Sequence, residues 1–377
     1  TGFAHLFEHL MFAGSKNVDD YDYYIQKAGG ENNAYTTNDS TNFYTVLPAA
    51  NLELVFWLES DRMVNLNINE NSLEVQRKVV LEEFKETCLN QPYGDAWHHL
   101  TELAYKVHPY RWPTIGKVPR HIEEATLEDV RNFYHRFYHP ANAVLAVAGN
   151  IKTQEVKHLA EKWFADIPAG KGIQRMLPQE PPQHKIHQLT QHNHVPADAI
   201  FMAFHIPDRL HPDYYVADLM SDILCSGGSS RLYRRLHKEQ KVFAQIDAYI
   251  TGSLDPGLLV IEGRPRQGTS ISEATEMIWA ELEQIKSEGI TQRELQKLKN
   301  KVESELLFSE MSVLNKALNL AFFEGIGKAE WINQEVDRYK AISTQDILRF
   351  ANETLVKENC SELFYLSSIG AASSFDN

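Results

Sequence analysis

Residues 126–150, TLEDVRNFYHRFYHPANAVLAVAGN, line up without a gap with residues 343–368, STQDILRFANETLVKENCSELFYLSS. Both stretches open with Ser or Thr followed three residues later by Asp, a spacing typical of a capped helix start. In each stretch an asparagine, Asn142 or Asn359, precedes an apolar run that we expect to be a strand, residues 143–149 in the first. The chain therefore contains one helix–strand unit twice, which indicates an internal duplication.

The duplication divides the chain into two similar domains. Residues 175–183, RMLPQEPPQ, interrupt any helical or strand period with three prolines and mark the expected linker. On either side of it, helical patterns are interleaved with strand patterns. We therefore expect an α+β protein with two similar domains, residues 1–180 and 181–377.

Two strands and two helices can be placed from the periodicity of their residues. Residues 41–48 and 257–263 show the pattern of sheet strands that follow turns. Residues 72–89 and 271–289 repeat apolar residues at helical spacing, and Gly289 suits the C-cap of the second helix. Each half thus combines strands with long amphipathic helices.

The composition argues against several classes of partner. A net charge of −14 over 377 residues disfavours a phosphate backbone, so we expect no nucleic-acid partner. The longest apolar runs are short strand-like pieces, so we expect no membrane-spanning segment. Three cysteines far apart in the sequence favour buried thiols in a reducing compartment. We expect a cytoplasmic protein, with the periplasm or secretion as the alternative because the chain begins abruptly.

The first fifteen residues, TGFAHLFEHLMFAGS, contain His5, Glu8 and His9 in the order H-x-x-E-H. Residues four apart on an α-helix lie on one face, so both histidines can point at one ion. Imidazole suits zinc, and a carboxylate at this offset can act on a metal-bound water. The alternative is three polar residues that merely share a helix, and the spacing favours the metal site.

A catalytic zinc needs three protein ligands and an open position, so a third ligand must come from another element. The expected helix over residues 72–89 offers Glu82, Glu83 and Glu86. At about 100° per residue, Glu83 lies about 60° from Val80, at the margin of the buried stripe. The other two glutamates project about 120–160° away from Val80 and fit a solvated acidic face. Glu83 is therefore the favoured third ligand.

These motifs resemble those of the inverted-zincin metallopeptidases of the insulinase, pitrilysin and mitochondrial-processing-peptidase type. The resemblance covers nearly the whole chain, including the opening motif and residues 29–48, 76–84, 108–116, 138–150 and 227–236. It implies a processing-peptidase-like fold in which each domain is a mostly antiparallel sheet packed with helices. It also implies that the first domain begins here without its N-terminal strand or strands.

The resemblance also implies roles for single residues. Zinc (Zn²⁺) would be held by His5, His9 and Glu83, with Glu8 as the general base on a zinc-bound water. The protein would be a zinc-dependent endopeptidase that hydrolyses peptides or small unfolded proteins inside a clamshell chamber. A second chain would complete the chamber, so we expect a homodimer, or a heterodimer with a related subunit.

Substrate binding is the further role that the resemblance implies. Asn33 and Ala34 would belong to an edge strand where a substrate peptide adds by backbone pairing. An ordinary edge strand remains the alternative. Leu219, Asp222 and Ile223 match the opening motif in the second half, which therefore cannot bind zinc in the same way.

Two departures from the family pattern bear on activity. Gln76, two helical turns before Glu83, stands where the family usually carries a second catalytic carboxylate. His237 and Ala244 stand where the inactive half commonly offers an Arg and a Tyr. Both departures favour the alternative function, a non-catalytic peptide-binding subunit that supports an active partner chain. The intact opening motif favours the enzyme.

Overall fold

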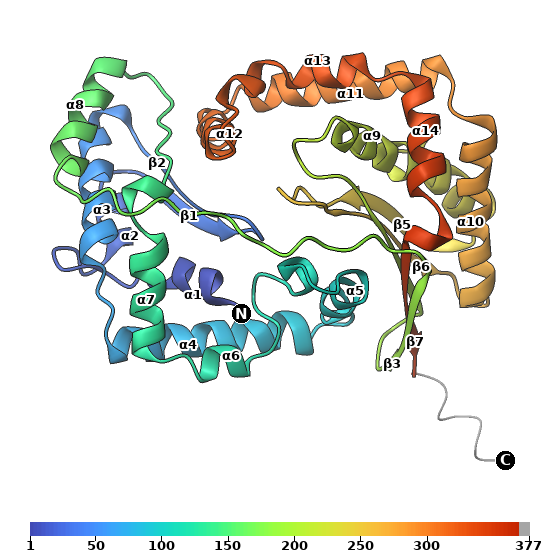
Figure 1. Ribbon diagram of the computed structural model, residues 1–377, viewed down its shortest axis with the longest axis horizontal. Helices are drawn as coiled ribbons and strands as arrows, with labels where there is room; N and C mark the ends of the chain where they lie inside the picture. Colours follow the sequence, from blue (N-terminus) through green and yellow to red (C-terminus); the bar gives the residue numbers. More distant parts are fainter. Residues whose placement is uncertain (369–377) are drawn as a thin grey trace. The chain divides into compact units, whose positions relative to one another are not determined.

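The computed structural model describes residues 1–368, which form two compact units (Figure 1). Unit 1 consists of residues 1–86, 113–176 and 306–334, and unit 2 consists of residues 87–112, 177–305 and the chain from Glu335. Both units combine helices with a sheet, so the α+β class with two domains is confirmed. The boundary between residues 180 and 181 stays a prediction, because neither unit is a continuous half of the chain.

Unit 1 packs its helices around a two-stranded antiparallel sheet. Strands β1 (Glu31–Thr36) and β2 (Thr41–Val46) pair from Glu31 opposite Val46 to Thr36 opposite Thr41, so the strand expected over residues 41–48 is confirmed. The helices of this unit are α1 (Phe3–Leu10), α2 (Tyr21–Lys27), α3 (Leu52–Asn65), α4 (Glu70–Phe84), α6 (Arg120–Glu123), α7 (Leu127–Phe137), α8 (Thr153–Phe164) and α12 (Val313–Gly325).

The main core of unit 1 lies where α1, α4 and α7 meet. Its buried side chains are Leu6, Phe7, Leu10, Met11, Leu73, Val80, Ile122, Val130 and Tyr134. A helix as short as α1 is not stable in isolation, so its formation depends on this packing. Burying a large apolar side chain contributes about 1.5–3 kcal/mol, and three of the core residues come from α1 itself. The apolar face of α1 therefore fixes the direction in which its polar face points.

Helix α4 begins and ends at recognisable signals. Asn69 Oδ1 accepts from the Ser72 backbone N–H, and Ser72 Oγ accepts from the Asn69 backbone N–H, both at 3.0 Å. This reciprocal capping box satisfies two backbone donors at the start of the helix. The helix expected over residues 72–89 is α-helical only to Phe84, because Lys85–Leu89 forms a wider π-turn.

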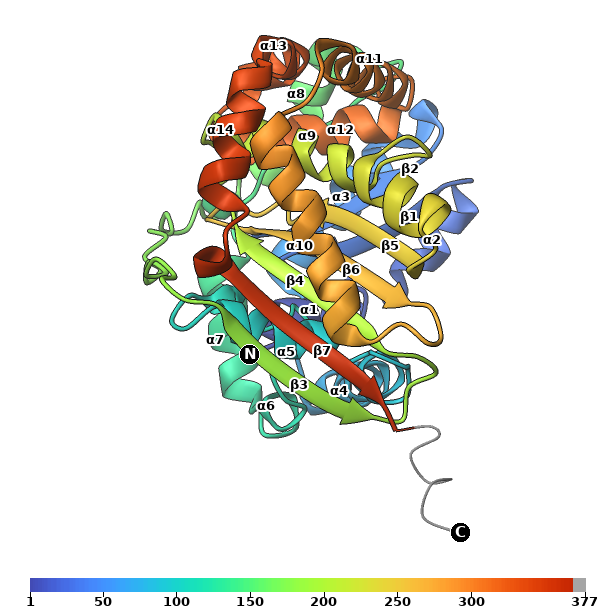
Figure 2. The same cartoon turned by 90° about the vertical axis from the view of Figure 1, so that its right-hand side faces the viewer.

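Unit 2 is built on a five-stranded sheet in the order β3–β7–β4–β6–β5 (Figure 2). The β3–β7 pair is parallel and the other pairs are antiparallel, as expected for a mostly antiparallel sheet. The strands are β3 (His187–Asn193), β4 (Ala199–His205), β5 (Phe243–Ile250), β6 (Leu258–Pro265) and β7 (Cys360–Ser367). The helices are α5 (Ala96–Ala104), α9 (Asp213–Cys225), α10 (Ile271–Glu288), α11 (Gln292–Ser309, whose last turn belongs to unit 1), α13 (Glu335–Ala341) and α14 (Thr344–Thr354).

Helices cover both faces of the unit 2 sheet. On β4, Phe201 packs in the cluster that includes α5, whereas Phe204 contacts Trp279 of α10, which crosses the opposite face (Figure 2). A strand covered on both sides has no polar face, which explains the continuous apolar run of β4. Helix α10 ends at Gly289 with φ 69°, so the predicted glycine C-cap and the strand predicted over residues 257–263 are confirmed.

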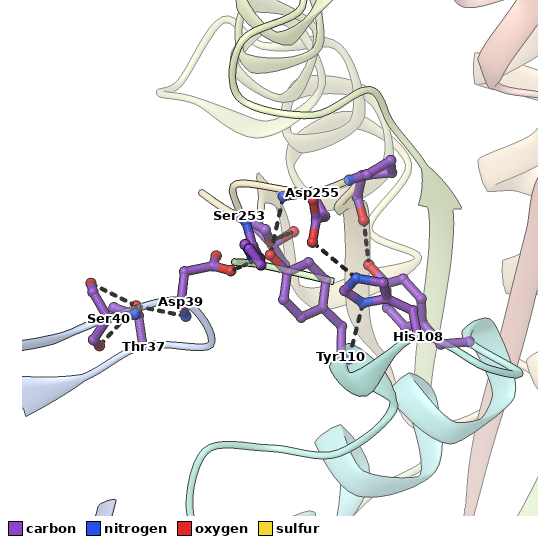
Figure 3. Close-up of polar contacts among 11 residues, drawn as sticks. Thr37, Asp39, Ser40, His108, Tyr110, Ser253 and Asp255 are labelled. Carbon is purple, nitrogen blue, oxygen red and sulfur yellow. Dashed lines mark hydrogen bonds and ion pairs between the residues drawn. The ribbon is translucent and has the colours of Figure 1, made fainter. Parts of the chain in front are cut away.

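A network of hydrogen bonds holds the start of the 108–116 segment in unit 2 (Figure 3). Glu180 accepts from the backbone N–H groups of residues 106–108 at 2.7–3.0 Å. The buried His108 ring accepts at Nδ1 from the Tyr110 N–H (3.2 Å), so its Nε2 carries the hydrogen that is donated to Asp255 (3.0 Å). These contacts give the segment a structural role in this unit.

The duplicated stretches form the same helix and turn in both units. Thr126 and Ser343 cap α7 and α14, each in a capping box with the Asp three residues on. Beyond the helices, Asn142 Nδ2 donates to the Phe137 carbonyl (2.8 Å). Asn359 Nδ2 makes the matching bond to the Thr354 carbonyl (3.0 Å). The two stretches thus agree down to single hydrogen bonds.

The stretches diverge after the turn. In unit 2 the chain continues into β7, which pairs with β3 and β4. In unit 1 the strand expected over residues 143–149 does not form, because within residues 1–368 no other strand pairs with it. That prediction is wrong for the described chain.

Among residues 1–368, no helix combines the length and apolar character needed to cross a membrane.

Candidate metal centre

Helix α1 presents His5 and His9 side by side. One helical turn separates them, and the opposite side of the helix is fixed in the core by Leu6, Phe7 and Leu10. The Nε2 atoms of the two rings lie 3.3 Å apart, and the rings meet edge to face. Their side chains are 12% and 25% exposed, which leaves the pair reachable from solvent.

Helix α4 packs against α1 and brings Glu83 to the two histidines. Glu83 Oε2 lies 3.5 Å from His5 Nε2 and 3.4 Å from His9 Nε2. Within the described residues, these three side chains form the one group of His, Cys, Asp or Glu compact enough to hold a metal ion. The structure therefore brings the three predicted ligands together.

The spacing of the three atoms fits a tetrahedral zinc ion. Zinc binds His nitrogen and carboxylate oxygen at about 2.0–2.2 Å, which places neighbouring ligands of a tetrahedron about 3.3–3.6 Å apart. The three observed separations, 3.3, 3.4 and 3.5 Å, fall inside that interval. Two imidazoles and one carboxylate are also the donor set of many catalytic zinc sites, which keep a fourth position open.

The electrostatics of the site suit a cation. Burial lowers the pKa of His5, which keeps its ring neutral at physiological pH. The hydrogen bond with His9 lowers the pKa of the Glu83 carboxyl, which keeps that group ionised. Metal binding requires neutral imidazole and ionised carboxylate, so both groups already stand in the protonation state that a ligand needs.

The neighbouring glutamates lie apart from this group. Glu82 is 60% exposed, compared with 39% for Glu83, and forms an ion pair with Lys85 (3.2 Å). Glu86 is exposed on the π-turn. The orientation expected from helical geometry thus agrees with the observed positions of all three side chains. Gln76 lies two turns before Glu83 on α4 and is half-buried.

Glu8 is held by a contact that sequence reasoning missed. The Thr36 hydroxyl, at the end of β1, donates a hydrogen bond of 2.5 Å to Glu8 Oε2. Nothing in the spacing of the two residues indicates this contact, since it depends on how β1 packs against α1. The only available signal was that Thr36 lies in the same expected edge strand as Asn33 and Ala34.

The proposed substrate residues lie in the middle of β1. Among the described strands, β1 pairs with β2 alone, so its other side is an edge. The Ala34 backbone N–H donates to the side-chain oxygen of its neighbour Asn33 (2.8 Å). Because side chains alternate along a strand, Ala34 shares a face with Thr36 while Asn33 points to the opposite face. Ala34 is thus on the side of β1 that faces Glu8.

Within the described residues, the matching positions in unit 2 do not form a second group compact enough to hold a metal ion. Leu219 and Ile223 of α9 are buried in the core, and Asp222 forms an ion pair with Lys301. His237, on the π-helix Tyr233–Glu239, donates from Nδ1 to the Phe243 carbonyl (3.1 Å), and Ala244 is exposed on β5. In unit 2 these positions thus serve core packing and an ion pair.

Family models, curated relatives and a solved structure resemble this chain. The family model described as "Insulinase (Peptidase family M16)" matches residues 1–117, and the model described as "Peptidase M16 inactive domain" matches residues 124–302. The zinc protease PqqE of Helicobacter pylori is 27% identical, over 94% of this chain and 80% of its own length. A probable mitochondrial-processing peptidase subunit beta of Schizosaccharomyces pombe is 26% identical over the same shares. The crystal structure of a protease from Helicobacter pylori matches with a TM-score of 0.90 at 26% identity, covering 97% of this chain and 89% of that one.

Proposed function

Because this chain belongs to the insulinase family of peptidases, family M16, we propose that it is a zinc-dependent endopeptidase that hydrolyses peptides or small unfolded proteins. The observation that carries this conclusion is the triangle of His5, His9 and Glu83, with donor atoms 3.3–3.5 Å apart. The names of the relatives, a zinc protease and a processing peptidase subunit, support the same reaction class.

In the proposed reaction, α1 and α4 supply the three zinc ligands, and α1 also supplies the general base. Held by His5, His9 and Glu83, zinc would supply a Lewis acid that makes water more acidic and stabilises negative charge on a peptide carbonyl oxygen. Glu8 stands next to a ligand on the same helix, so its carboxylate can take a proton from the attacking water and pass it to the leaving amine. General base catalysis of this kind needs no covalent intermediate and hence no Ser or Cys nucleophile.

Substrate would bind along the edge of β1. An extended peptide can pair its backbone with an edge strand, as in other proteins that add a peptide strand to a sheet. Ala34 has a small side chain on the face that it shares with Thr36, which lets another backbone approach the side where Glu8 lies. The Ala34 N–H already donates to the side-chain oxygen of Asn33. A carbonyl of the substrate backbone would replace this local hydrogen bond.

A second chain would complete the working enzyme. One relative is named as a subunit of a processing peptidase, and this chain supplies a single set of ligands within its described residues. We propose a dimer, either of two copies or with a related subunit. Light scattering of the purified protein alone gives its native mass and detects a dimer of two copies. A monomer whose mass rises only after cell-extract fractions are added indicates a related subunit instead.

The test of the proposed reaction combines metal analysis with cleavage of a library of quenched fluorescent peptides. The wild type should carry about one zinc per chain and cleave part of the library, and a chelator should abolish cleavage. Glu8→Gln should keep its zinc and lose at least about 100-fold in kcat, because a general base contributes about 10²–10⁴. A zinc-loaded wild type that cleaves nothing would instead favour the non-catalytic peptide-binding subunit.

A further inference from the structure

We propose that Thr36 is a positioning residue for Glu8, which deepens and rests on the function proposed above. Its hydroxyl donates to Glu8 Oε2 at 2.5 Å, a short distance typical of a hydrogen bond to an ionised acceptor. The hydrogen bonds of the Thr36 side chain go to Glu8 and Thr41, and not to the three proposed zinc ligands. It acts on the reaction through Glu8.

The direction of this hydrogen bond is fixed by counting hydrogens. A carboxylate can only accept, so the single hydroxyl hydrogen of Thr36 goes to Glu8. Thr41 Oγ1 lies 3.3 Å from Thr36 Oγ1, and its hydroxyl must then be the donor in that contact. The two threonines form a short chain of hydroxyl groups that ends on Oε2. The other carboxylate oxygen, Oε1, is left for the proton of the attacking water.

The hairpin between β1 and β2 sets the position of Thr36. Thr36 faces Thr41 in the last pair of the ladder, directly before a four-residue turn. In that turn the Thr37 N–H donates to the Ser40 carbonyl (2.8 Å), and the Ser40 N–H donates to Thr37 Oγ1 (3.1 Å), contacts that Figure 3 shows. A slip by one residue would turn the hydroxyl to the other face of the strand, away from Glu8. The turn therefore determines that a hydroxyl, and not a neighbouring side chain, meets the carboxylate.

Holding the carboxylate matters because a glutamate side chain has three rotatable bonds. A general base must lie within hydrogen-bond reach of the proton that it takes, and a small displacement slows the reaction. A hydrogen bond to a charged group corresponds to about a 10- to 100-fold change in an equilibrium or rate. Losing the Thr36 hydroxyl should therefore lower kcat by about that factor.

The test compares three variants of the full chain. Thr36→Val removes the hydroxyl at nearly constant volume, and Thr36→Ser keeps it. Thr45→Val is the matched control, because Thr45 lies on the same face of the same hairpin with its hydroxyl near Tyr21 instead (3.4 Å). With the best peptide of the library, Thr36→Val should lower kcat 10- to 100-fold with KM and zinc content unchanged. Thr36→Ser and Thr45→Val should stay within about threefold of the wild type.

A second measurement does not depend on activity. In crystal structures, the Glu8 carboxylate should occupy one conformer in the wild type and more than one in Thr36→Val. A single unchanged conformer in Thr36→Val overturns the inference, and so does an unchanged kcat in an active enzyme. An equal loss in Thr36→Val and Thr36→Ser also overturns it, since that result would mean a structural role in the hairpin. A wild type that holds zinc and cleaves no peptide overturns the proposed function itself.

Discussion

Lys301 of α11 donates to both carboxylate oxygens of Asp222 on α9, at 3.0 and 2.9 Å. Asp222 stands at the position of α9 that matches Glu8 in α1. The helix of unit 2 thus keeps a carboxylate at this position and neutralises it with an internal cation. At the two histidine positions, α9 carries Leu219 and Ile223, which are buried in the core of unit 2. The duplicated helix is part of the core in unit 2 and part of a site in unit 1.

Replacing Lys301 should leave metal binding intact. In Lys301→Met, zinc content and peptide cleavage should equal those of the wild type, because the ion pair lies in unit 2 alone. The free energy of unfolding should fall by about 1 kcal/mol or less, since the Lys301 side chain is 37% exposed and water screens the pair. Urea unfolding and metal analysis check both points. Loss of zinc in this variant would contradict the separation of the two roles.

Glu83 and Glu82 should differ sharply as metal ligands. Glu83→Gln replaces an ionised oxygen donor by a neutral amide, so zinc affinity should drop by at least about 100-fold, because changing even an outer-shell partner of a ligand typically costs about 10- to 100-fold. Glu82→Gln changes the same residue type one position away and should bind zinc like the wild type. Competition with a chromogenic chelator measures both affinities. Equal affinities in the two variants would remove Glu83 from the ligand set.

The core beneath α1 should dominate the stability of unit 1. Phe7 is fully buried and stacks on Phe133 and Tyr138 with ring centroids 4.8 and 5.3 Å apart. Phe7→Ala should therefore cost about 3–5 kcal/mol of unfolding free energy and release zinc on mild heating. Tyr23→Ala is the control, because Tyr23 is 54% exposed and should cost about 0.5 kcal/mol. Similar losses in both variants would contradict this placement of the core.

His205 should make the protein less stable as the pH falls below about 6.5. Burial lowers the pKa of His205 in the folded chain, where the neutral ring donates from Nε2 to the Ala104 carbonyl (3.0 Å). The unfolded chain binds the proton first, so unfolding becomes easier from pH about 6.5 downward, and no such effect exists above it. Urea unfolding of the wild type and of His205→Gln at pH 7.5, 6.5 and 5.5 should give a smaller acid loss for the variant. Parallel losses would exclude His205 as the cause.

The sequence predicted those features that depend on local spacing. The order H-x-x-E-H, the choice of Glu83 over Glu82, and the capped helices after Thr126 and Ser343 all follow from helical periodicity. Each agrees with the structure because α1, α4, α7 and α14 are regular helices whose faces a count of residues can assign.

Features that depend on a partner element could not be predicted in the same way. Residues 143–149 have the apolar composition of a strand, but a strand also needs a neighbour with which to exchange hydrogen bonds. Similarly, the contact from Thr36 to Glu8 requires both the hairpin register and the packing of β1 on α1. Neither is encoded in a single stretch, so Thr36 carried no signal of its own.

The open edge of β1 has a consequence beyond catalysis. A strand with one unpaired side is also a place where identical chains can join into fibres. The strand reads ENNAYT, and its glutamate and two asparagines are residues that favour strands poorly. Such an edge gives only weak and temporary pairing to any extended chain. A peptide can then pair with this edge, be cut and leave, while the same edge does not join copies of the protein into fibres.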